Sequence, residues 1–452
     1  MLITNIAHGW TGDAAGTRLT GAIRVEGGII TAMGTLAPRP GEDLLDARGC
    51  VVTPGLVNTH HHLFQSALKG LAINAPLDSW LEQVPYSYWP ALDEDALRIS
   101  ARIGLAELAL SGATTVCDHH YIFSDRYDYD PAEVLFSEAA RFGLRFVLAR
   151  GGMARGRDFG PAVPAAPTES VARFLDGVAQ AAARWHDPAP DAMMRVACAP
   201  TTPNFNFPPT ALPEIAQEAR RLGLRLHAHL SENTAYAAQT LRDFGKRPVP
   251  WLADLDWLGP DVWFAHLVDL QPEEVALLAA TGTAMAHCPQ ANARLGSGIA
   301  PAPALHRAGG IVSLAVDGAG ANEAADMGAA LYTAFSLHRA AHGVAATAPG
   351  TILHWTTMGG ARALGLPSLG ELAVGKAADI TLFDLDDLRN FGLHDPGLAP
   401  MVTGAARVRH SMVAGRLIVR DGRLPGLDLA ALSDAAHHTT RRLARLPVPD
   451  LV

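Results

Sequence analysis

The sequence contains few cysteines and no paired cysteine motif. Cys50, Cys117, Cys198 and Cys288 are spread over 452 residues, and none stands in a CxxC pair. This spacing excludes a disulfide framework of the kind that staples small secreted proteins. Buried free thiols in a reducing compartment are the simplest interpretation, and we expect a cytoplasmic protein.

Long apolar runs and clusters of one charge are also missing. No stretch of about 20 apolar residues occurs, and the first residues, MLITNIAHGW, lack the charged and apolar regions of a secretory signal. The formal net charge is −9, and Lys and Arg form no stripe, which argues against nucleic acid as the main partner. We expect a small-molecule substrate and neither a membrane nor a nucleic-acid partner; homo-oligomer formation is left open.

The sequence does contain enough apolar residues for a large core. Hydrophobic residues make up 49% of the chain, whose length exceeds the size at which one core stops growing, about 250–300 residues. Residues 54–365 alternate apolar runs with Ala-rich helical segments, which indicates βαβ units, whereas both ends of the chain contain short strands with Gly and Pro turns. We therefore predict an α/β fold with a (β/α)8 TIM-like barrel over 54–365. A small β-sandwich domain is expected from both termini, over 1–53 and 366–452, with a last helix near 428–445.

Histidines and carboxylates stand where several of these apolar runs end. The first run ends in His60-x-His62, and later runs end in His229, His266 and Asp317. The ends of barrel strands converge on one face, so these side chains are expected to meet. Residues i and i+2 of a strand share a side, so His60 and His62 can face one ion while His61 points away. Three imidazoles and a carboxylate suit a zinc ion with a position open for water, although iron or manganese would accept the same set.

Longer motifs carry a resemblance to a known family. They are PGLVNTHHHLFQ at 54–65, SGATTVCDHHY at 111–121, HLSE at 229–232, AHCPQANARL at 286–295, VDGAGANEAADM at 316–327 and LGELAVGKAADI at 369–380. In their order and content these motifs resemble the amidohydrolase superfamily, in the branch similar to cytosine and guanine deaminases. APTT at 199–202 and HDP at 394–396 look most similar to isoxanthopterin deaminases, with 8-oxoguanine deaminases next.

The resemblance implies a role for each polar residue at a strand end. It selects His60, His62, His229 and Asp317 as ligands of one zinc ion. Glu232, three residues after His229, then becomes the acid–base group, and His266 takes the position of the family's fourth histidine. His227 is expected behind the ligands, and His119 is expected to be structural.

Lysine is rare, and its positions bear on the number of metal ions. Some amidohydrolases bridge two metals with a carbamylated lysine on the fourth barrel strand. This chain has Lys69, Lys246 and Lys376 only, and none ends an apolar run in the middle of the barrel. We therefore expect one metal ion.

The implied reaction is hydrolytic deamination. Asp317 would take the proton of the attacking water, Glu232 would protonate the ring nitrogen beside the reacting carbon, and His266 would stabilise the developing oxyanion. General acid–base steps of this kind contribute about 10²–10⁴-fold each. Ammonia would leave.

Substrate-binding residues are expected at further strand ends. Gln65 follows the HxH motif by three and offers an amide that both donates and accepts. Arg150 could bind a ring carbonyl through its planar fork, or could instead form a salt bridge within a loop. Tyr121 and Thr201 end two further runs. The aromatic residues that follow the first strand could stack on a planar ring or form a dimer contact; they are Trp80, Tyr86, Tyr88 and Trp89.

The preferred substrate is an aminated oxo-heterocycle, with a pterin such as isoxanthopterin first and 8-oxoguanine or guanine second. A triazine hydrolase or another ring amidohydrolase is a rival on the same scaffold. A non-catalytic assembly protein is disfavoured because all four metal ligands and Glu232 are present. Two departures from the family, Ala291 and Gly320 in place of Ser, are expected to reshape the pocket wall.

Overall fold

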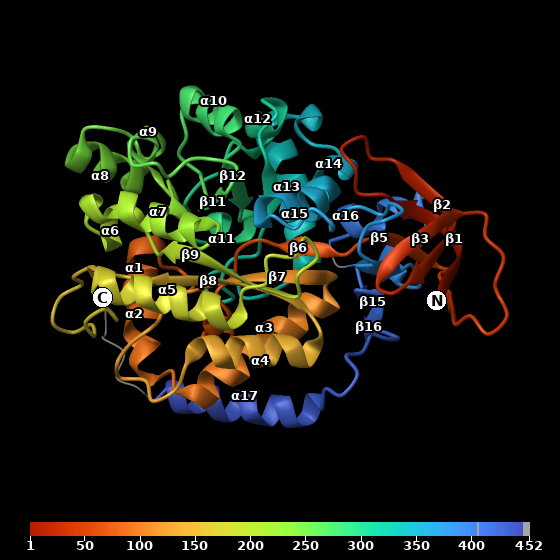
Figure 1. Cartoon of the computed structure of the whole chain (residues 1–452), viewed down its shortest axis with the longest axis horizontal. Coiled ribbons are helices and arrows are strands. Elements are labelled where there is room, and N and C mark those ends of the chain that lie inside the picture. Colours follow the sequence, from red (N-terminus) through yellow and green to blue (C-terminus); the bar gives the residue numbers. More distant parts are fainter. Residues whose placement is uncertain (405, 446–452) are drawn as a thin grey trace.

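Eight parallel strands form the barrel. The computed structural model describes residues 1–404 and 406–445, and Figure 1 shows the barrel beside a smaller sheet. Hydrogen bonds join the strands in chain order, from β6 to β13. The strands are β6 (Leu56–Asn58), β7 (Ala113–His120), β8 (Arg145–Gly152), β9 (Met194–Pro200), β10 (Leu226–Leu230), β11 (Val262–His266), β12 (Ala284–His287) and β13 (Val312–Leu314). This architecture confirms the predicted barrel.

The last strand meets the first through the segments that follow both. The backbone N–H of Asp317 donates to the carbonyl of His60 over 3.1 Å, and the N–H of Val316 donates to Asn58 Oδ1 over 3.0 Å. Residues separated by more than 250 positions in the sequence therefore become neighbours. This closure brings the HxH motif and Asp317 together.

Helices cover the outside of the barrel. Several begin at a side chain whose oxygen accepts a backbone N–H of the first turn, as Asp93 does for α3 and Asp326 for α13, which is the usual N-cap arrangement. The helices of six or more residues are α1 (Leu77–Gln83), α3 (Glu94–Leu110), α4 (Pro131–Phe142), α5 (Val171–Trp185), α7 (Leu212–Arg221), α8 (Thr234–Phe244), α9 (Pro248–Ala253), α10 (Pro272–Thr281), α11 (Pro289–Arg294), α12 (Ala302–Arg307), α13 (Met327–His342), α14 (Pro349–His354) and α17 (Leu429–Leu443). The shorter ones are α2 (Pro85–Tyr88), α6 (Pro203–Asn206), α15 (Gly360–Leu364) and α16 (Ala399–Val402).

Both termini contribute to the second sheet, at the right of Figure 1. Its strands are β1 (Leu2–Trp10), β2 (Arg18–Glu26), β3 (Ile29–Gly34), β4 (Leu44–Asp46), β5 (Cys50–Pro54), β14 (Ile380–Asp384), β15 (Val408–Val413) and β16 (Arg416–Val419). They pair in the order β16-β15-β14-β5-β1-β2-β3, with β4 on β1. The predicted sandwich is thus one continuous mixed sheet, and its apolar residues form a core separate from that of the barrel.

The chain passes from this sheet into the barrel at Gly55. A Cβ atom at this position would lie 2.1 Å from the Thr114 hydroxyl oxygen, so only glycine allows β6 to approach β7 this closely. A buried ion pair also joins the two parts: Arg145 Nε of β8 lies 2.7 Å from Asp379 Oδ2, and both side chains are almost fully buried. Removing one partner of such a pair would leave a buried charge uncompensated.

The last helix packs on the barrel rather than on the sheet. This helix was expected in one segment with the C-terminal part of the sandwich, but α17 runs along α3 at the bottom of Figure 1. Leu443 is buried in the core that the barrel residues form, and Arg442 Nη1 lies 2.7 Å from Asp93 Oδ2 at the start of α3. Ala405 and residues 446–452 of the predicted C-terminal segment lie outside the described residues.

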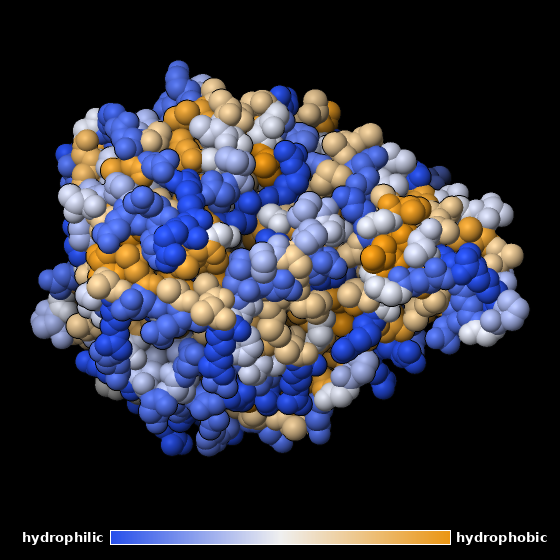
Figure 2. Space-filling view, in the orientation of Figure 1, coloured by the Kyte–Doolittle hydropathy of each residue, from blue (hydrophilic) through white to orange (hydrophobic). Residues whose placement is uncertain are grey.

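Hydrophobic residues on the visible face form separate patches among hydrophilic ones (Figure 2). Among the described residues, no helix combines the length and the apolar character needed to cross a bilayer.

Candidate metal centre and active-site cavity

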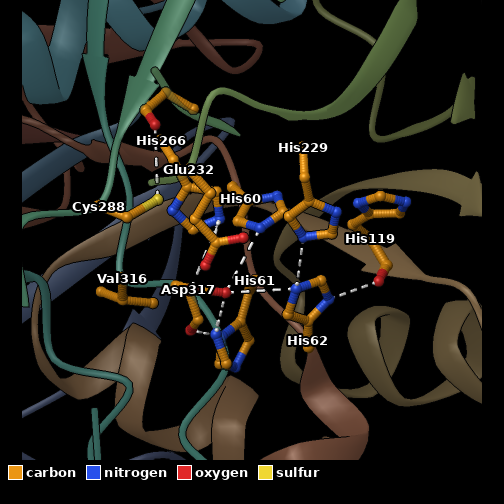
Figure 3. A network of polar contacts seen from close by, with 12 residues as sticks. His60, His61, His62, His119, His229, Glu232, His266, Cys288, Val316 and Asp317 are labelled. Atoms are coloured by element: carbon orange, nitrogen blue, oxygen red, sulfur yellow. Dashed lines mark hydrogen bonds and ion pairs between the residues drawn. The ribbon is translucent and has the colours of Figure 1, made fainter. Parts of the chain in front are cut away.

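The polar residues at the strand ends converge on one buried point (Figure 3). His60 and His62 follow β6, His229 lies in β10, His266 ends β11 and Asp317 follows β13. All five side chains are buried. Their convergence follows from the parallel arrangement of the strands, which places every carboxyl end on the same face of the barrel.

Backbone carbonyl groups determine the tautomer of two of these histidines. His62 Nδ1 lies 2.7 Å from the His119 carbonyl oxygen, and His229 Nδ1 lies 2.6 Å from the Thr201 carbonyl oxygen. A carbonyl oxygen only accepts, so each Nδ1 donates its proton. The unprotonated Nε2 atoms then face the centre of the cluster, which is the form that binds metal ions.

A chain of two histidines orients His60 in the same way. His227 Nδ1 donates to the Trp263 carbonyl over 3.0 Å, so His227 Nε2 accepts from His60 Nδ1 over 2.8 Å. This leaves the buried His60 Nε2 with no hydrogen-bond partner among the described residues. Such an unpartnered buried nitrogen is costly unless something else binds it.

The inward-facing atoms have the spacing that metal ligands need. His62 Nε2 lies 3.2 Å from His229 Nε2, and Asp317 Oδ1 lies 3.4 Å from His60 Nε2 and 3.3 Å from His62 Nε2. Tetrahedral ligands about 2.0–2.1 Å from zinc lie roughly 3.3 Å from one another. These four residues can therefore hold a divalent ion.

Burial and neighbouring imidazoles hold the histidines in their neutral form. Burial is the largest cause that lowers the pKa of His60, His62 and His229 well below the usual value, and nearby imidazoles lower it further. Neutral imidazole is the form that ligates metal. The nitrogen atoms of the cluster are thus able to bind a cation at neutral pH.

The backbone is strained where these side chains leave the strands. His266 has a φ of 74°, Asp317 a φ of 62° and Ser231 a φ of 49°. This left-handed region is unfavourable for residues other than glycine, and such strain concentrates at functional sites. Here the left-handed backbone conformation turns the chain where it leaves the strands at the opening of the barrel.

Glu232 lies beside the cluster with a pKa suited to carrying a proton. Burial raises the pKa of Glu232 to about 7, while His266 lowers it and Asp317 raises it. His266 Nε2 lies 3.7 Å from Glu232 Oε1 and 4.0 Å from Asp317 Oδ2. The ring is oriented by Asn292 of the HCPQAN motif, whose Oδ1 lies 2.9 Å from His266 Nδ1. A carboxylic acid, an imidazole and a carboxylate thus surround one point, an arrangement able to move protons.

A cavity opens beside this cluster. Three of the four residues predicted to bind substrate line it, namely Gln65, Tyr121 and Thr201. Gln65 Oε1 is buried and lacks a hydrogen-bond partner among the described residues. Of the aromatic residues after the first strand, Trp80 and Tyr86 line the cavity, whereas Trp89 donates through Nε1 to the Ala165 carbonyl oxygen.

Arg150 lies elsewhere, which corrects the prediction that it binds a ring carbonyl. Its guanidinium pairs with both carboxylate oxygens of Glu169 and lies 4.0 Å from the ring centre of Phe123. It lines a separate hollow between the 122–131 loop and α5. The side chain leaves β8 on the outer face of the strand, because successive residues point to opposite faces. The loop salt bridge considered as its alternative is therefore the arrangement present.

Sequence reasoning missed several residues that line the cavity. They are Asp78, Arg157, Phe205, Asn206, Tyr236 and Gln239, among others. Most lie in loops or short helices without a recognisable motif, so no signal in the sequence singled them out.

Two further imidazoles lie beside this centre, whereas the three lysines pair with groups that do not line the cavity. His119 stacks on His229 with ring centres 4.8 Å apart, and His61 turns away to the carbonyl of Asp317. Lys69 pairs with Glu107, Lys246 with Asp254, and Lys376 donates to the Pro367 carbonyl. In the described part of the chain no lysine lines the cavity.

Comparison with known proteins assigns the chain to the same family that its sequence motifs resemble. Residues 51–418 match the amidohydrolase family. The chain is 45% identical to isoxanthopterin deaminase from an unknown prokaryotic organism, over 94% of this chain and 92% of the relative. It is 38% identical to 8-oxoguanine deaminase of Pseudomonas aeruginosa, over 93% and 94% of the two chains.

Solved structures agree with this similarity. The crystal structure of atrazine chlorohydrolase TrzN from Arthrobacter aurescens TC1, complexed with zinc, superposes with a TM-score of 0.89 at 29% identity, covering 97% of this chain and 99% of that one. Members of this family typically depend on a metal ion, and the buried histidine and aspartate cluster is able to hold one. With its barrel, its cluster and its deaminase relatives, the chain belongs to the amidohydrolase family and is a hydrolase that acts on carbon–nitrogen bonds.

Proposed function

We propose that the protein is a mononuclear zinc aminohydrolase that removes the amino group of an oxo-substituted fused heterocycle and releases ammonia. A pterin such as isoxanthopterin is the first choice, supported by the 45% identity to isoxanthopterin deaminase. The observation that carries the reaction type is Glu232, a buried carboxyl group with a pKa raised to about 7, beside four converging metal-ligand atoms. The four free, buried cysteines support a cytoplasmic location.

His60, His62, His229 and Asp317 would hold the metal ion. Their imidazole and carboxylate donors fit zinc, with iron or manganese as alternatives. When bound, the ion supplies an acidified water close to neutral pH. The absence of a cavity-lining lysine among the described residues favours one ion over two.

The protein's own groups then move the protons. Asp317 accepts the proton of the water that attacks the ring carbon bearing the amine. Glu232, protonated at neutral pH, donates its proton to the adjacent ring nitrogen, so that the carbon becomes tetrahedral. His266, oriented by Asn292, stabilises the charge on the new oxygen. The proton on Asp317 passes to the amine, which leaves as ammonia as its bond to carbon breaks. The new hydroxyl group returns a proton to Glu232 and becomes the ring carbonyl.

Substrate would be held by residues that line the cavity beside the metal ligands. Gln65 offers both an acceptor and donors to a flat heterocycle, and Tyr121 and Thr201 line the same cavity. Trp80 lies nearby, and its indole N–H donates to the Gly320 carbonyl over 2.9 Å. Because Gly320 has no side chain, Trp80 and Gln65 can pack against its backbone. A Cβ atom at Gly320 would lie 3.2 Å from Gln65 Oε1.

An ammonia-coupled screen tests the reaction and the substrate class together. We expect ammonia from 2-amino-4-oxo bicycles. Adenosine should react poorly because a site built to bind a ring oxygen rejects analogues that lack it, and cytosine should react poorly because it lacks the second ring. The screen should cover pterins, purines, pyrimidines and triazines. If adenosine or cytosine reacts faster than every pterin and oxopurine, the proposed substrate is wrong. Turnover of a chlorotriazine without ammonia would instead favour the triazine hydrolase alternative.

The pH dependence of kcat/KM tests the role of Glu232. Its pKa is raised to about 7 by burial, and its protonated form is the proton donor. The active fraction should therefore fall as pH rises through about 7, giving an alkaline limb. Rates measured from pH 5.5 to 9.5, with metal content checked at each pH, would show it. A profile that stays flat to pH 9 would contradict this assignment.

An 8-oxoguanine or guanine deaminase is the second candidate. It is favoured by the 38% identity to 8-oxoguanine deaminase and uses the same groups in the same steps. Relative kcat/KM for isoxanthopterin and 8-oxoguanine in the screen decides between them.

A further inference from the structure

Arg157 is the one cation among the described residues that line the active-site cavity. Apart from the imidazoles, the other ionisable lining groups are the carboxyl groups of Asp78, Asp317 and Glu232, the last of which is the protonated acid of the proposed reaction. An oxygen-rich heterocycle that enters this cavity would therefore meet acidic groups at most charged positions. The guanidinium of Arg157 is the group that can offset this repulsion.

Arg157 lies at the outer end of the cavity. Its side chain is 23% exposed and that of its partner Asp78 is 56% exposed, whereas His60, at the metal cluster, is fully buried. The reacting carbon of a substrate belongs at the buried end, beside Glu232 and the metal ligands. A ring fused to the reacting one would then extend toward Arg157.

Aromatic rings hold the guanidinium in place. Its carbon lies 4.8 Å from the ring centre of Phe205, which also lines the cavity, and 5.2 Å from that of Phe159. Phe159 in turn packs on Tyr86. Stacking of this kind orients the planar fork without using its N–H donors.

Most of the donors of Arg157 are available. Within the described residues its one hydrogen bond runs from Nη2 to Asp78 Oδ1, over 2.9 Å. Arg157 lowers and Asp78 raises the pKa of Glu232, so both side chains lie within electrostatic reach of the proton donor. The free N–H groups of the fork suit an oxygen with two lone pairs.

We propose that Arg157 selects substrates with an oxygen on the ring remote from the reacting amine, by binding that carbonyl or its enolate form. This inference rests on the proposed deaminase function and narrows it to fused bicycles with an oxygen on each ring. Asp78 accepts one hydrogen bond from the guanidinium, and the substrate oxygen would be a second acceptor. The role that the sequence analysis gave to Arg150 thus passes to Arg157.

Two substrate pairs that differ in one oxygen test this inference. Isoxanthopterin and pterin differ in the oxygen on the remote ring, as do 8-oxoguanine and guanine. The wild type should prefer the oxygen-bearing member of at least one pair. In Arg157→Met, kcat/KM for that member should fall about 10–100-fold, because a charge-assisted hydrogen bond is lost. The other member should change little, so the preference disappears.

Two further variants serve as controls. Arg173→Met removes an exposed guanidinium that pairs with Asp125 outside the cavity and should leave the preference intact. Arg157→Lys keeps the charge but not the fork and should restore part of the preference. Metal content and thermal unfolding, measured for every variant, would show that each is folded and loaded.

The outcomes separate the inference from the proposed function. If the wild type deaminates none of the four compounds, the proposed function fails and the inference fails with it. Only the inference fails if the wild type deaminates these compounds but Arg157→Met lowers kcat/KM equally for both members of a pair. The same holds if Arg157→Met lowers kcat/KM for neither member. A wild type that prefers the member without the remote oxygen would also overturn it.

Discussion

Glu232→Gln is expected to lower kcat by about 10²–10⁴-fold, the contribution typical of a general acid–base group, while the metal content stays at the wild-type level. Glutamine has nearly the same shape as glutamate but cannot donate a proton to the ring nitrogen. Glu232 is not among the four residues that converge on the metal position, so its replacement leaves their spacing intact. Steady-state ammonia release and elemental analysis of the same sample measure both quantities.

The matched control for this variant is Glu218→Gln. Glu218 lies in α7, where it pairs with Arg221 near the surface, so the same chemical change should leave kcat unaltered. Glu232→Gln should also lack the alkaline limb of the pH profile, because no titrating proton donor is left. Near-normal turnover in a metal-replete Glu232→Gln sample would show that another group donates the proton.

His229→Ala is expected to lose the metal ion, and activity with it. Even partners that only orient a ligand contribute about 10–100-fold to metal affinity, so loss of a ligand should cost more than that. Metal content after dialysis against a weak chelator, measured by elemental analysis, gives the comparison with wild type. His227→Ala provides the graded case, since His227 accepts a hydrogen bond from His60 without facing the cluster, and it should weaken affinity by roughly the smaller factor.

The same elemental analysis gives the number of metal ions bound per chain. One tightly held ion per wild-type chain is expected. Two tightly held ions, or an active wild type without any, would contradict the mononuclear site, and a His229→Ala protein that keeps one ion and full activity would remove His229 from the ligand set.

The metal cluster could be anticipated from the sequence because its geometry is local or repeats from strand to strand. His60 and His62 were expected to share a face by the two-residue period of a strand, and they do face one point although β6 ends at Asn58. The other candidates follow from the rule that parallel barrel strands end on one face. Glu232 came from the resemblance to the amidohydrolase superfamily, in which the acid–base glutamate follows a metal-binding histidine by three residues. No knowledge of side-chain packing was needed for these assignments.

The substrate wall could not be anticipated in the same way. Arg150 ends an apolar run as convincingly as His266 does, yet its side chain leaves on the outer face of β8 and meets Glu169. Arg157 lies in an irregular loop and reaches the cavity only because Phe205, Phe159 and Asp78 hold it there. Loop conformation depends on contacts between distant segments, and these leave no periodic signal.

The sequence by itself determined the fold class, through alternating strand and helix patterns, and the family, through motifs that resemble the amidohydrolase superfamily; the candidate metal ligands came from the same motifs. The tertiary structure alone decided which ring nitrogen faces the metal position, through contacts such as that of His62 with the His119 carbonyl. It also decided that α17 covers the barrel and that Arg157, not Arg150, lines the cavity. These features depend on side-chain direction and on packing between elements far apart in sequence, which are settled only when the barrel closes.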